Sequence, residues 1–543
     1  MSNLMSDQNV ELQEISVKTK TLETDDAALS RLGKKSVLKR RFSFLSILGF
    51  SCTVLITWEG SLIVFLLALQ NGGSAGVVYG FLVAWLGAIS TFIILSELVS
   101  IAPTSGGQYH WVSMLAPRRL QKVLSYVAGW LTLAGWQSAV ASGAYLTGTM
   151  IQGLLVLTQP SYVPQNWHGT LFVWAVLLFA VTINIAAGWL LPKFEGAILV
   201  LHIVGFFGVL IPLLTLGPKT EPKEVFTSFS NLGGWSTQGL SFCIGLMGNV
   251  FAFGGGDGAI HLSEEIQNAA IVVPRSIMTG IMINGSLGFA MVLTVLFRSG
   301  DIEAALVENP EYPFIAIFKH AVNSTSGAAA MASVVLCLSA SATVGVLASS
   351  SRVLWAFSRD KGLPGWQTWS TVSSRTSIPA YSVIATTLIA CVLALINIGS
   401  ATAFNGIVSV AIAGIFSSYL LVASLLLYRR LTGGIVLASE LPVSSPDGSI
   451  ADEEVRIIWG PWRIPGVLGI ANNVFACAYL TFVLFFSFWP SFAEVNPGNM
   501  NWSILVTGFV AICSTMYYLV RAKKTYHGPV VEVGPRYVLN GDA

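Results

Sequence analysis

The sequence predicts an all-α integral membrane protein with twelve transmembrane helices. Only 10% of its 543 residues are charged and 54% are hydrophobic, whereas about a quarter of a soluble globular chain is charged. Twelve apolar segments approach or exceed the roughly 20 residues that a helix needs to cross a bilayer. The basic residues are also distributed very unevenly between the connections on the two sides of these segments.

The predicted spans follow one another with turn or breaker residues between most of them. Examples are Asn71-Gly72-Gly73, Pro160, Pro364-Gly365 and Pro497-Gly498, which are typical of turns. The spans cover residues 44–69, 76–101, 123–157, 170–190, 194–216, 239–262, 276–297, 327–358, 379–398, 402–427, 465–490 and 500–520.

Lys and Arg predict the orientation of the chain. An even number of spans places both termini on one side, and 25 of the 29 basic residues fall on that side. The other four are Lys219, Lys223, Arg298 and Lys319. Because cytoplasmic connections are enriched in basic residues, both termini are predicted to be cytoplasmic. A plasma-membrane location is expected, although the charge pattern does not distinguish one membrane from another. A net charge of only +2 gives no support to a nucleic-acid partner.

Two tails flank the helical domain. Residues 1–41 are predicted to be a disordered cytoplasmic tail, residues 42–525 the helical domain and residues 526–543 a second cytoplasmic tail. The six cysteines all lie in apolar segments without metal-ligand spacing, so we expect small buried hydrophobic side chains. No metal site and no cofactor are predicted.

Two spans contain residues that interrupt a membrane helix, and these predict the binding site. The first span carries Thr57, Trp58, Glu59 and Gly60; the sixth carries Phe253, Gly254, Gly255, Gly256 and Asp257, followed by Gly258. Each helix-interior Gly costs about 1 kcal/mol relative to Ala, and unwound backbone persists in a membrane only where it lines a cavity or is buried in protein. If residues 44–216 and 239–427 are two repeat halves, with 465–520 outside the repeat, the interruptions correspond. Paired interruptions of this kind indicate a solute site at mid-membrane.

Several motifs resemble one transporter superfamily. Pro103-Thr104-Ser105-Gly106-Gly107-Gln108-Tyr109 after the second span is similar to the P-x-x-G-G-x-Y signature of the amino acid–polyamine–organocation superfamily. Ser351-Arg352 with Arg359-Asp360 and Gly362-Leu363-Pro364 at the end of span eight, and Glu264-Glu265 with Pro274-Arg275 after span six, are similar to it as well. Thr57-Trp58-Glu59-Gly60, Gly107-Gln108-Tyr109-His110-Trp111-Val112 and Trp167-His168-Gly169-Thr170 resemble its fungal amino acid/choline transporter branch, over about residues 42–525.

The resemblance implies a leucine-transporter-like fold of five-plus-five inverted repeats, with solute bound between spans one, three, six and eight. It implies a permease for amino acids or small amines such as choline or γ-aminobutyrate. The chain departs from the pattern in two places: Asn268-Ala269 stands where the superfamily often has Asn-Pro, and Trp58-Glu59 stands where amino-acid carriers have small residues. The second departure puts a plain amino-acid substrate in doubt.

Two ionisable residues inside the spans lead to mechanistic hypotheses. His202 in span five is predicted to carry the coupling proton, because a histidine titrates near physiological pH; the alternative is a histidine that is only hydrogen-bonded to a neighbouring helix. Glu59 would attract an ammonium group and repel a carboxylate, which favours cationic or zwitterionic amines. The alternative is that Glu59 points away from the solute as a proton carrier or helix cap.

Other functions and features remain open or are disfavoured by the sequence. We find no nucleophile–base pair or metal cluster for an enzyme, so no catalytic residue is predicted, and no charged ring for a channel. A non-transporting nutrient sensor and a carrier of a specialised metabolite or its precursor remain alternatives. Glu97, Glu264 and Glu265 are expected to form ion pairs with Arg275, Arg352 or Arg359, and Asn323-Ser324-Thr325 is a possible glycosylation site.

Overall fold

The computed structural model confirms the all-α membrane fold. It describes the backbone of residues 25–300, 305, 308–309, 311–399, 401–437, 439, 457–497 and 499–532. Within this part of the chain, eleven helices are long and apolar enough to cross a membrane. The twelfth predicted span, the sixth in sequence, is broken into two pieces. Two short parallel strands, β1 (Ile435–Val436) and β2 (Ile457–Ile458), pair with each other near one end of the helix bundle.

The first five predicted spans correspond to a series of helices in the amino-terminal half. The first is interrupted between α2 and α3, and α4 continues from it without a loop. The helices are α2 (Phe44–Leu55), α3 (Thr57–Ile63), α4 (Phe65–Ile101), α5 (Gln108–Leu115), α6 (Gln121–Thr158), α7 (Asn166–Ile185), α8 (Leu191–Leu216) and α9 (Pro222–Thr227).

The turn expected at residues 71–73 is a sharp kink inside α4. Gly73 has φ 66° and ψ −173°, a conformation that only glycine adopts easily. A Cβ atom here would lie 2.6 Å from the carbonyl oxygen of Ser228. The chain therefore changes direction at Gly73 while the helix continues on both sides.

The second half repeats the pattern of a broken first helix followed by long ones. The loop expected between spans seven and eight contains α14, an addition that the sequence interpretation missed. The elements are α10 (Gln238–Phe251), α11 (Gly258–His261), the 3₁₀ turn η1 (Ser263–Glu265), α12 (Ala269–Arg298), α14 (Pro313–Val322), α15 (Thr325–Arg359), α16 (Trp366–Trp369), α17 (Ala380–Ala394), α18 (Ile396–Gly399), α19 (Ala401–Leu431), α20 (Gly466–Phe486), α21 (Ser503–Tyr517), the π turn η3 (Tyr518–Ala522) and α22 (Lys523–Thr525).

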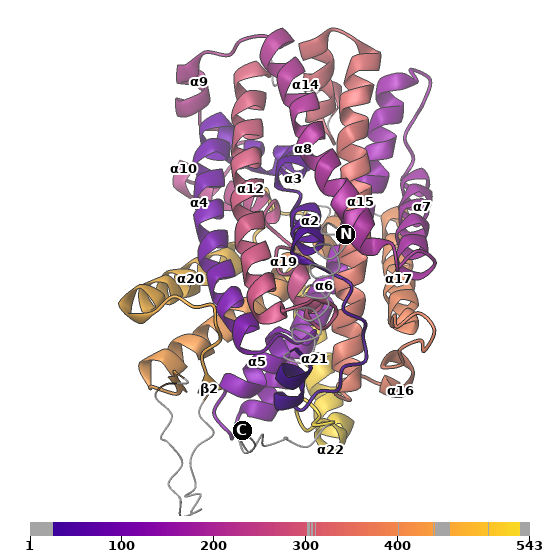
Figure 1. Cartoon of the computed structure of the whole chain (residues 1–543). Helices are drawn as coiled ribbons and strands as arrows, with labels where there is room; N and C mark the ends of the chain where they lie inside the picture. Colours follow the sequence, from indigo (N-terminus) through magenta and orange to yellow (C-terminus); the bar gives the residue numbers. More distant parts are fainter. Residues whose placement is uncertain are drawn as a thin grey trace, which may run out of the picture.

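Long helices surround the broken ones. The helices α15 and α19 both pack against α6, while α10 and α12 pack against α4. The helix α20 lies at the edge of the bundle (Figure 1). Large apolar side chains of α8, including Val200, Val204, Phe207 and Ile211, are exposed on its outer face. Their three-to-four-residue spacing is that of one helix face, and an exposed apolar face is suited to lipid.

The amino-terminal tail is not disordered over its whole length. Residues 25–31 are helical, and Lys34, only 1% exposed, forms an ion pair with Asp360 at the end of α15. The backbone N–H groups of Arg41 and Phe42 donate to the carbonyl of Glu265. The sequence interpretation did not include these contacts, because a buried ion pair between distant segments leaves no local pattern. Residues 1–24 lie outside the described residues.

The carboxyl-terminal tail is ordered as far as it is described. Tyr526 is fully buried and its hydroxyl is 2.6 Å from that of Ser125. The N–H of Val530 donates to Asp360 Oδ1 over 2.9 Å. Residues 526–532 therefore pack at the end of the bundle that carries α5 and α22, which we call the α5 end (Figure 1).

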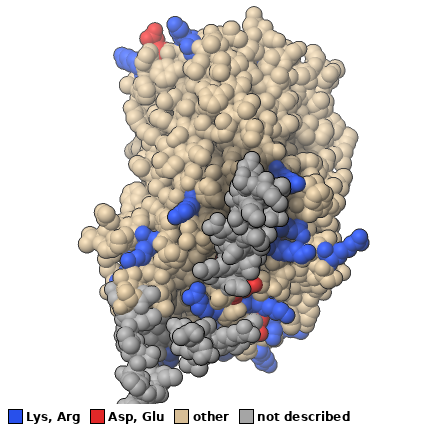
Figure 2. All heavy atoms as spheres, viewed as in Figure 1, with Lys and Arg blue, Asp and Glu red and all other residues tan. Residues whose placement is uncertain are grey.

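The distribution of charge agrees with the sequence expectation. Lys and Arg gather in the half of the molecule that contains the α5 end, and few appear at the α9–α14 end (Figure 2). The six cysteines are all free, and Cys337 and Cys513 are exposed on α15 and α21. The expectation that all six are buried was wrong, because apolar segments also present side chains to the outer surface of the bundle.

Candidate solute and proton sites

The first helix break lies at Ile56, slightly earlier than Glu59-Gly60. Ile56 adopts a left-handed conformation with φ 32°, which is strained for a β-branched residue. The N–H of Thr57 donates to Asn284 Oδ1 over 3.1 Å, although in a continuous helix it would donate to the carbonyl of Thr53. The side chain of Asn284 thus replaces a lost helical bond, and both Glu59 and Gly60 lie inside α3.

The second break lies where the glycine run predicts it. The helix α10 ends at Phe251, and α11 begins only at Gly258. Gly255 has φ 86°, and a Cβ atom on Gly256 would lie 2.3 Å from the ring of Phe92. The glycines therefore permit both the unwound backbone and its close contact with neighbouring helices.

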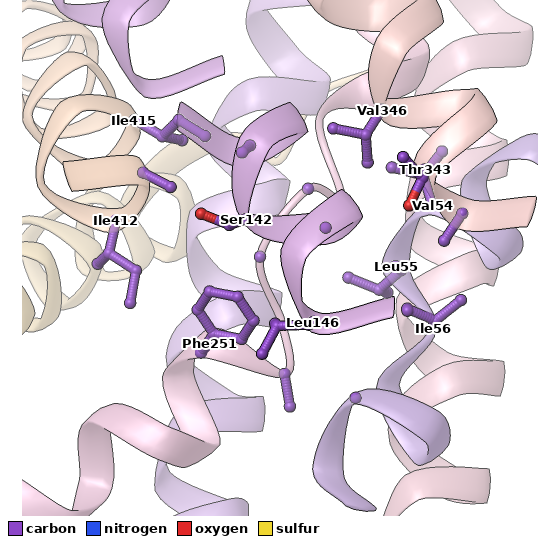
Figure 3. A pocket seen from close by; sticks show the side chains of 18 of the residues that line it. Val54, Leu55, Ile56, Ser142, Leu146, Phe251, Thr343, Val346, Ile412 and Ile415 are labelled. Atoms are coloured by element: carbon purple, nitrogen blue, oxygen red, sulfur yellow. The ribbon is translucent and has the colours of Figure 1, made fainter. Parts of the chain in front are cut away.

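A cavity of about 120 Å³ lies where the two breaks meet (Figure 3). Since one water needs only about 10–15 Å³ by the same measure, the cavity can hold a small solute. Its wall is mainly apolar and includes the rings of Trp136, Phe251 and Phe416. Its polar side-chain groups among the described residues are the hydroxyls of Ser142, Ser339 and Thr343 and the indole N–H of Trp136. No charged side chain is among the described residues that line it.

The predicted spans one, three, six and eight all contribute to this cavity, and α19 adds a fifth wall. Of the nine candidate residues, Gly60, Gly254 and Gly255 line it. The remaining candidates, Thr57, Trp58, Glu59, Phe253, Gly256 and Asp257, do not appear in its lining. Phe253 instead packs on the ring of Phe81, with centroids 5.1 Å apart.

Glu59 and His202 form a buried acid–histidine pair beside the cavity. Glu59 Oε1 is 2.6 Å from His202 Nδ1, and neither side chain has any exposed surface. Trp58 Nε1 is 3.2 Å from the same nitrogen. Of the remaining polar atoms of the pair, Glu59 Oε2 and His202 Nε2 have no partner among the described residues. The sequence interpretation selected both residues but did not predict that they would meet.

The hydrogen bonds of this pair depend on one proton. The indole N–H of Trp58 can only donate, so its bond to Nδ1 requires a bare Nδ1, and Glu59 must then carry the proton. If Nδ1 carries the proton instead, it donates to Glu59, and Trp58 loses its acceptor. Moving one proton between Glu59 and His202 therefore changes the contacts that join α3 to α8.

Glu195 is a second buried carboxyl group that the sequence interpretation missed. It lies on α8 without exposed surface and accepts a hydrogen bond from the hydroxyl of Thr53 on α2. Its other oxygen, Oε1, has no partner among the described residues. Glu195 lies at the edge of the predicted span 194–216, where a carboxylate is expected to face the membrane–water interface. Packing of α2 against α8 is what buries it.

Asp257 belongs to a polar layer next to the cavity. Gln108 Nε2 donates to Asp257 Oδ2 over 2.9 Å, and His261 Nε2 is 3.3 Å from the same oxygen. His261 Nδ1 donates to the carbonyl of Ser105. Trp136, which lines the cavity, places its ring edge-on to His261 with 5.3 Å between centroids. Asp257 thus reaches the cavity only through its neighbours.

Ion pairs hold the α5 end together. Arg359 donates to both oxygens of Glu264 at 2.7 and 2.9 Å, and Arg352 Nε lies 2.8 Å from Glu265 Oε1. These are pairings that the sequence interpretation expected. Glu97 pairs instead with Arg430 at the end of α19. At the opposite end, Asn323 is exposed between α14 and α15, and its glycosylation stays a prediction.

Comparison with known proteins identifies the family. The profile of the amino acid permease family matches residues 42–510. A choline transporter of Saccharomyces cerevisiae is 28% identical over 494 residues, which cover 90% of this chain and 83% of the relative. Amino-acid permease 2 of Neurospora crassa is 26% identical over 521 residues, covering 94% and 90%. A swainsonine transporter of Arthroderma benhamiae is 28% identical over 526 residues, covering 94% and 96%. The chain is therefore a multi-pass membrane transporter that belongs to the amino acid permease family.

Proposed function

We propose that the chain is a secondary active transporter of a small amine or amino acid, coupled to protons, with the solute bound in the central cavity. The observation that carries the proposal is the position of this cavity. It touches both helix breaks and the helices α6, α15 and α19 at once. A solute held there contacts segments from both halves of the chain, so its binding can favour one arrangement of the halves over another.

The chemistry of the cavity wall favours a cationic or zwitterionic amine over an acidic solute. Val54 and Leu55, at the carboxyl end of α2, and Phe251, at the carboxyl end of α10, all line it. A helix carries a partial negative charge of about half a unit at this end, which attracts an ammonium group. The rings of Trp136 and Phe416 add aromatic faces, each worth about 0.5–2 kcal/mol to a cation.

Glu59 serves this proposal as a proton carrier and not as a direct solute contact. Its carboxyl group faces His202 and is absent from the described lining of the cavity. This is the alternative role that the sequence left open for Glu59. The helix α3 lines the solute cavity with Gly60 and contacts α8 through the Glu59–His202 pair. Protonation of the pair and binding of solute therefore both act on α3.

The solute is tested by competition in transport-deficient cells that express the chain. Choline, γ-aminobutyrate, neutral amino acids, glutamate and swainsonine are offered against a labelled solute that the cells take up. We expect the small amines to compete and glutamate to compete poorly. Thr343→Val and Ser142→Ala keep the size of the wall but remove hydroxyls, and each is expected to raise KM. Glu308→Gln, at the α9–α14 end and outside the cavity lining, is the control variant and should leave KM unchanged.

Two outcomes would change the assignment. Preferential transport of dicarboxylic amino acids would exclude the proposed solute class. Transport of swainsonine without uptake of simple amines would favour the alternative of a specialised-metabolite carrier, which the Arthroderma relative suggests by its name. Binding without transport of any solute on the panel would favour the sensor alternative.

We further infer that both termini are cytoplasmic and that the protein resides in the plasma membrane. The gathering of Lys and Arg at the α5 end supports this orientation. After replacement of the native cysteines, an impermeant thiol reagent applied from outside should label a cysteine at position 323 and spare one at position 118. Labelling in the reverse pattern would exclude this topology.

A further inference from the structure

A second, much larger cavity lies at the α5 end, away from the central one. Its volume is about 1180 Å³. It is lined by the end of α4, by α5, by the end of α19, by β2 and by Ala28, Arg31 and Leu32 of the amino-terminal segment, and it is open to the surface. We call it the basal cavity. The solute site proposed above shares no lining residue with it.

The charge in the basal cavity is positive. Arg31, Arg118 and Arg429 line it, and no Asp or Glu is among its described lining residues. None of these three arginines has an ion-pair partner within the part of the chain that the structure describes. The other arginines of this end that were discussed above, Arg352, Arg359 and Arg430, all pair with glutamates.

One of the three arginines is held in place independently of any ligand. Arg429 donates from Nε to the carbonyl of Leu115 and from Nη2 to that of Ala116. These bonds fix its guanidinium at the end of α5 but leave its charge without a counter-ion among the described residues. Arg31 and Arg118 are exposed and approach the cavity from the amino-terminal helix and from the segment after α5.

His110 contributes a buried side chain to the wall of the basal cavity. It lines the basal cavity with 3% of its surface exposed, and its Nδ1 is buried without a partner among the described residues. A buried polar atom without a hydrogen bond is costly. Burial, together with the positive charge of Lys34, lowers the pKa of His110 to about 4, so this side chain is neutral at neutral pH and the positive charge of the cavity comes from the three arginines.

We propose that the basal cavity binds an anion that carries phosphate groups, held by Arg31, Arg118 and Arg429 with His110 at its wall. The planar guanidinium group matches phosphate oxygens with two parallel hydrogen bonds. Three arginines from separate segments can balance a ligand with more negative charge than a single carboxylate carries, and phosphate groups carry such a charge. The ligand is either the headgroup of a phosphorylated lipid in the adjacent leaflet or a free phosphorylated metabolite, since both present the same chemistry.

An occupied basal cavity would join segments that are far apart in sequence. Arg31 precedes Lys34, whose ion pair with Asp360 fixes the amino-terminal segment to the end of α15. The ligand would add a second attachment between that segment and the ends of α5 and α19. We therefore expect bound ligand to raise the unfolding temperature of the full chain.

The test measures binding to the purified full chain and does not depend on transport. One arm adds inositol 1,4,5-trisphosphate to protein in phosphatidylcholine nanodiscs, and the other uses nanodiscs that contain phosphatidylinositol 4-phosphate. Affinity and unfolding temperature are recorded in each. Binding in the first arm shows that a free phosphorylated compound can occupy the cavity without a lipid. Binding only in the second arm assigns the site to a lipid headgroup. Absence of binding in both arms overturns the proposal.

Neighbouring arginines provide a matched control. Arg118→Gln and Arg31→Gln are expected to weaken binding about tenfold each, the loss typical of a charge-assisted hydrogen bond. Arg119 is the next residue along the chain, and its side chain does not line the cavity. Arg119→Gln removes the same charge as Arg118→Gln but should leave the affinity unchanged. Equal loss in Arg118→Gln and Arg119→Gln would reduce the effect to general surface charge and overturn the proposal.

One further variant separates an external ligand from the chain itself. Residues Asp452, Glu453 and Glu454 lie in a stretch outside the described residues and could provide a negative charge of their own. If the probes bind only after these residues are changed to Asn, Gln and Gln, the natural occupant is the acidic segment, and the proposal of an external phosphate ligand is wrong. Unfolding temperatures of all variants without probe control for misfolding.

Discussion

Four of the buried carboxyl groups fall into two sets with different partners. At the α5 end, Glu264 and Glu265 are paired with Arg359 and Arg352, and arginine stays protonated in proteins. Beside the central cavity, Glu59 faces His202 and Glu195 faces only the hydroxyl of Thr53. A guanidinium fixes the charge of a carboxylate, whereas a histidine or a hydroxyl lets it gain or lose a proton. The first set is therefore suited to holding helices together, and the second to changing charge during transport.

The largest effect expected from this comparison is on stability at the α5 end. Glu264→Gln removes the bidentate partner of the buried Arg359 and leaves it only the distant Glu532, 3.9 Å from its Nε. Breaking a buried pair costs about 3–5 kcal/mol. Thermal unfolding of the purified protein should show the loss. The double variant Glu264→Gln with Arg359→Gln should regain most of it, because the one charge left without Arg359, that of Glu532, is partly exposed and still accepts from the N–H of Lys35. A single variant as stable as the wild type would show that the pair does not hold this end.

The next effect concerns energy coupling and not folding. Glu59→Gln keeps the shape of the side chain but cannot exchange a proton with His202. We expect solute accumulation driven by a pH gradient to fall about tenfold or more, within the range of coupling energies seen between linked sites. Exchange of labelled for unlabelled solute without a gradient should persist, which shows that the cavity still works. Retained accumulation by this variant would place the coupling proton elsewhere.

Glu195→Gln should have a smaller effect on stability than Glu264→Gln. Its one described partner is the hydroxyl of Thr53, so the change alters a single hydrogen bond worth about 1 kcal/mol. We expect the free energy of unfolding to fall by about 1 kcal/mol or less and the dependence of uptake on pH to shift, measured as initial rates across a pH series. Thr53→Val is the matched variant on the other side of the bond. A loss of several kcal/mol would instead indicate a charged partner for Glu195.

The smallest effect is expected for an exposed ion pair at the opposite end. Hydrogen bonds from Lys319 and His320 lower the pKa of Glu308 below its ordinary value of 4.5. The ionised Glu308 therefore stabilises the fold at pH values above its ordinary pKa, and this contribution is lost as the pH falls through its lowered pKa in the folded protein. Because such exposed pairs contribute about 1 kcal/mol or less, Glu308→Gln should barely change unfolding at neutral pH. A large loss at pH 7 would mean that this pair anchors α14.

Much of the fold could be predicted from the sequence, because a bilayer imposes a length and composition on each helix. The glycine run at Gly254–Gly256 predicted the break in span six for a local reason, its cost in a helix. The break at Ile56 has no such local signal, since Asn284, more than two hundred residues away, replaces the missing bond. Glu195, Lys34 and the Glu59–His202 contact were not predicted for the same reason. Each depends on which helices pack together.

The central claim is that solute entering through the cavity brings a proton by way of Glu59 and His202. It is tested most directly in proteoliposomes that contain a pH-sensitive dye and carry no imposed gradient. Addition of a transported amine outside should acidify the interior of vesicles with the wild-type chain. Vesicles with Glu59→Gln or His202→Ala should take up labelled solute down its gradient without acidification. Solute entry into wild-type vesicles with no change of internal pH would contradict the account.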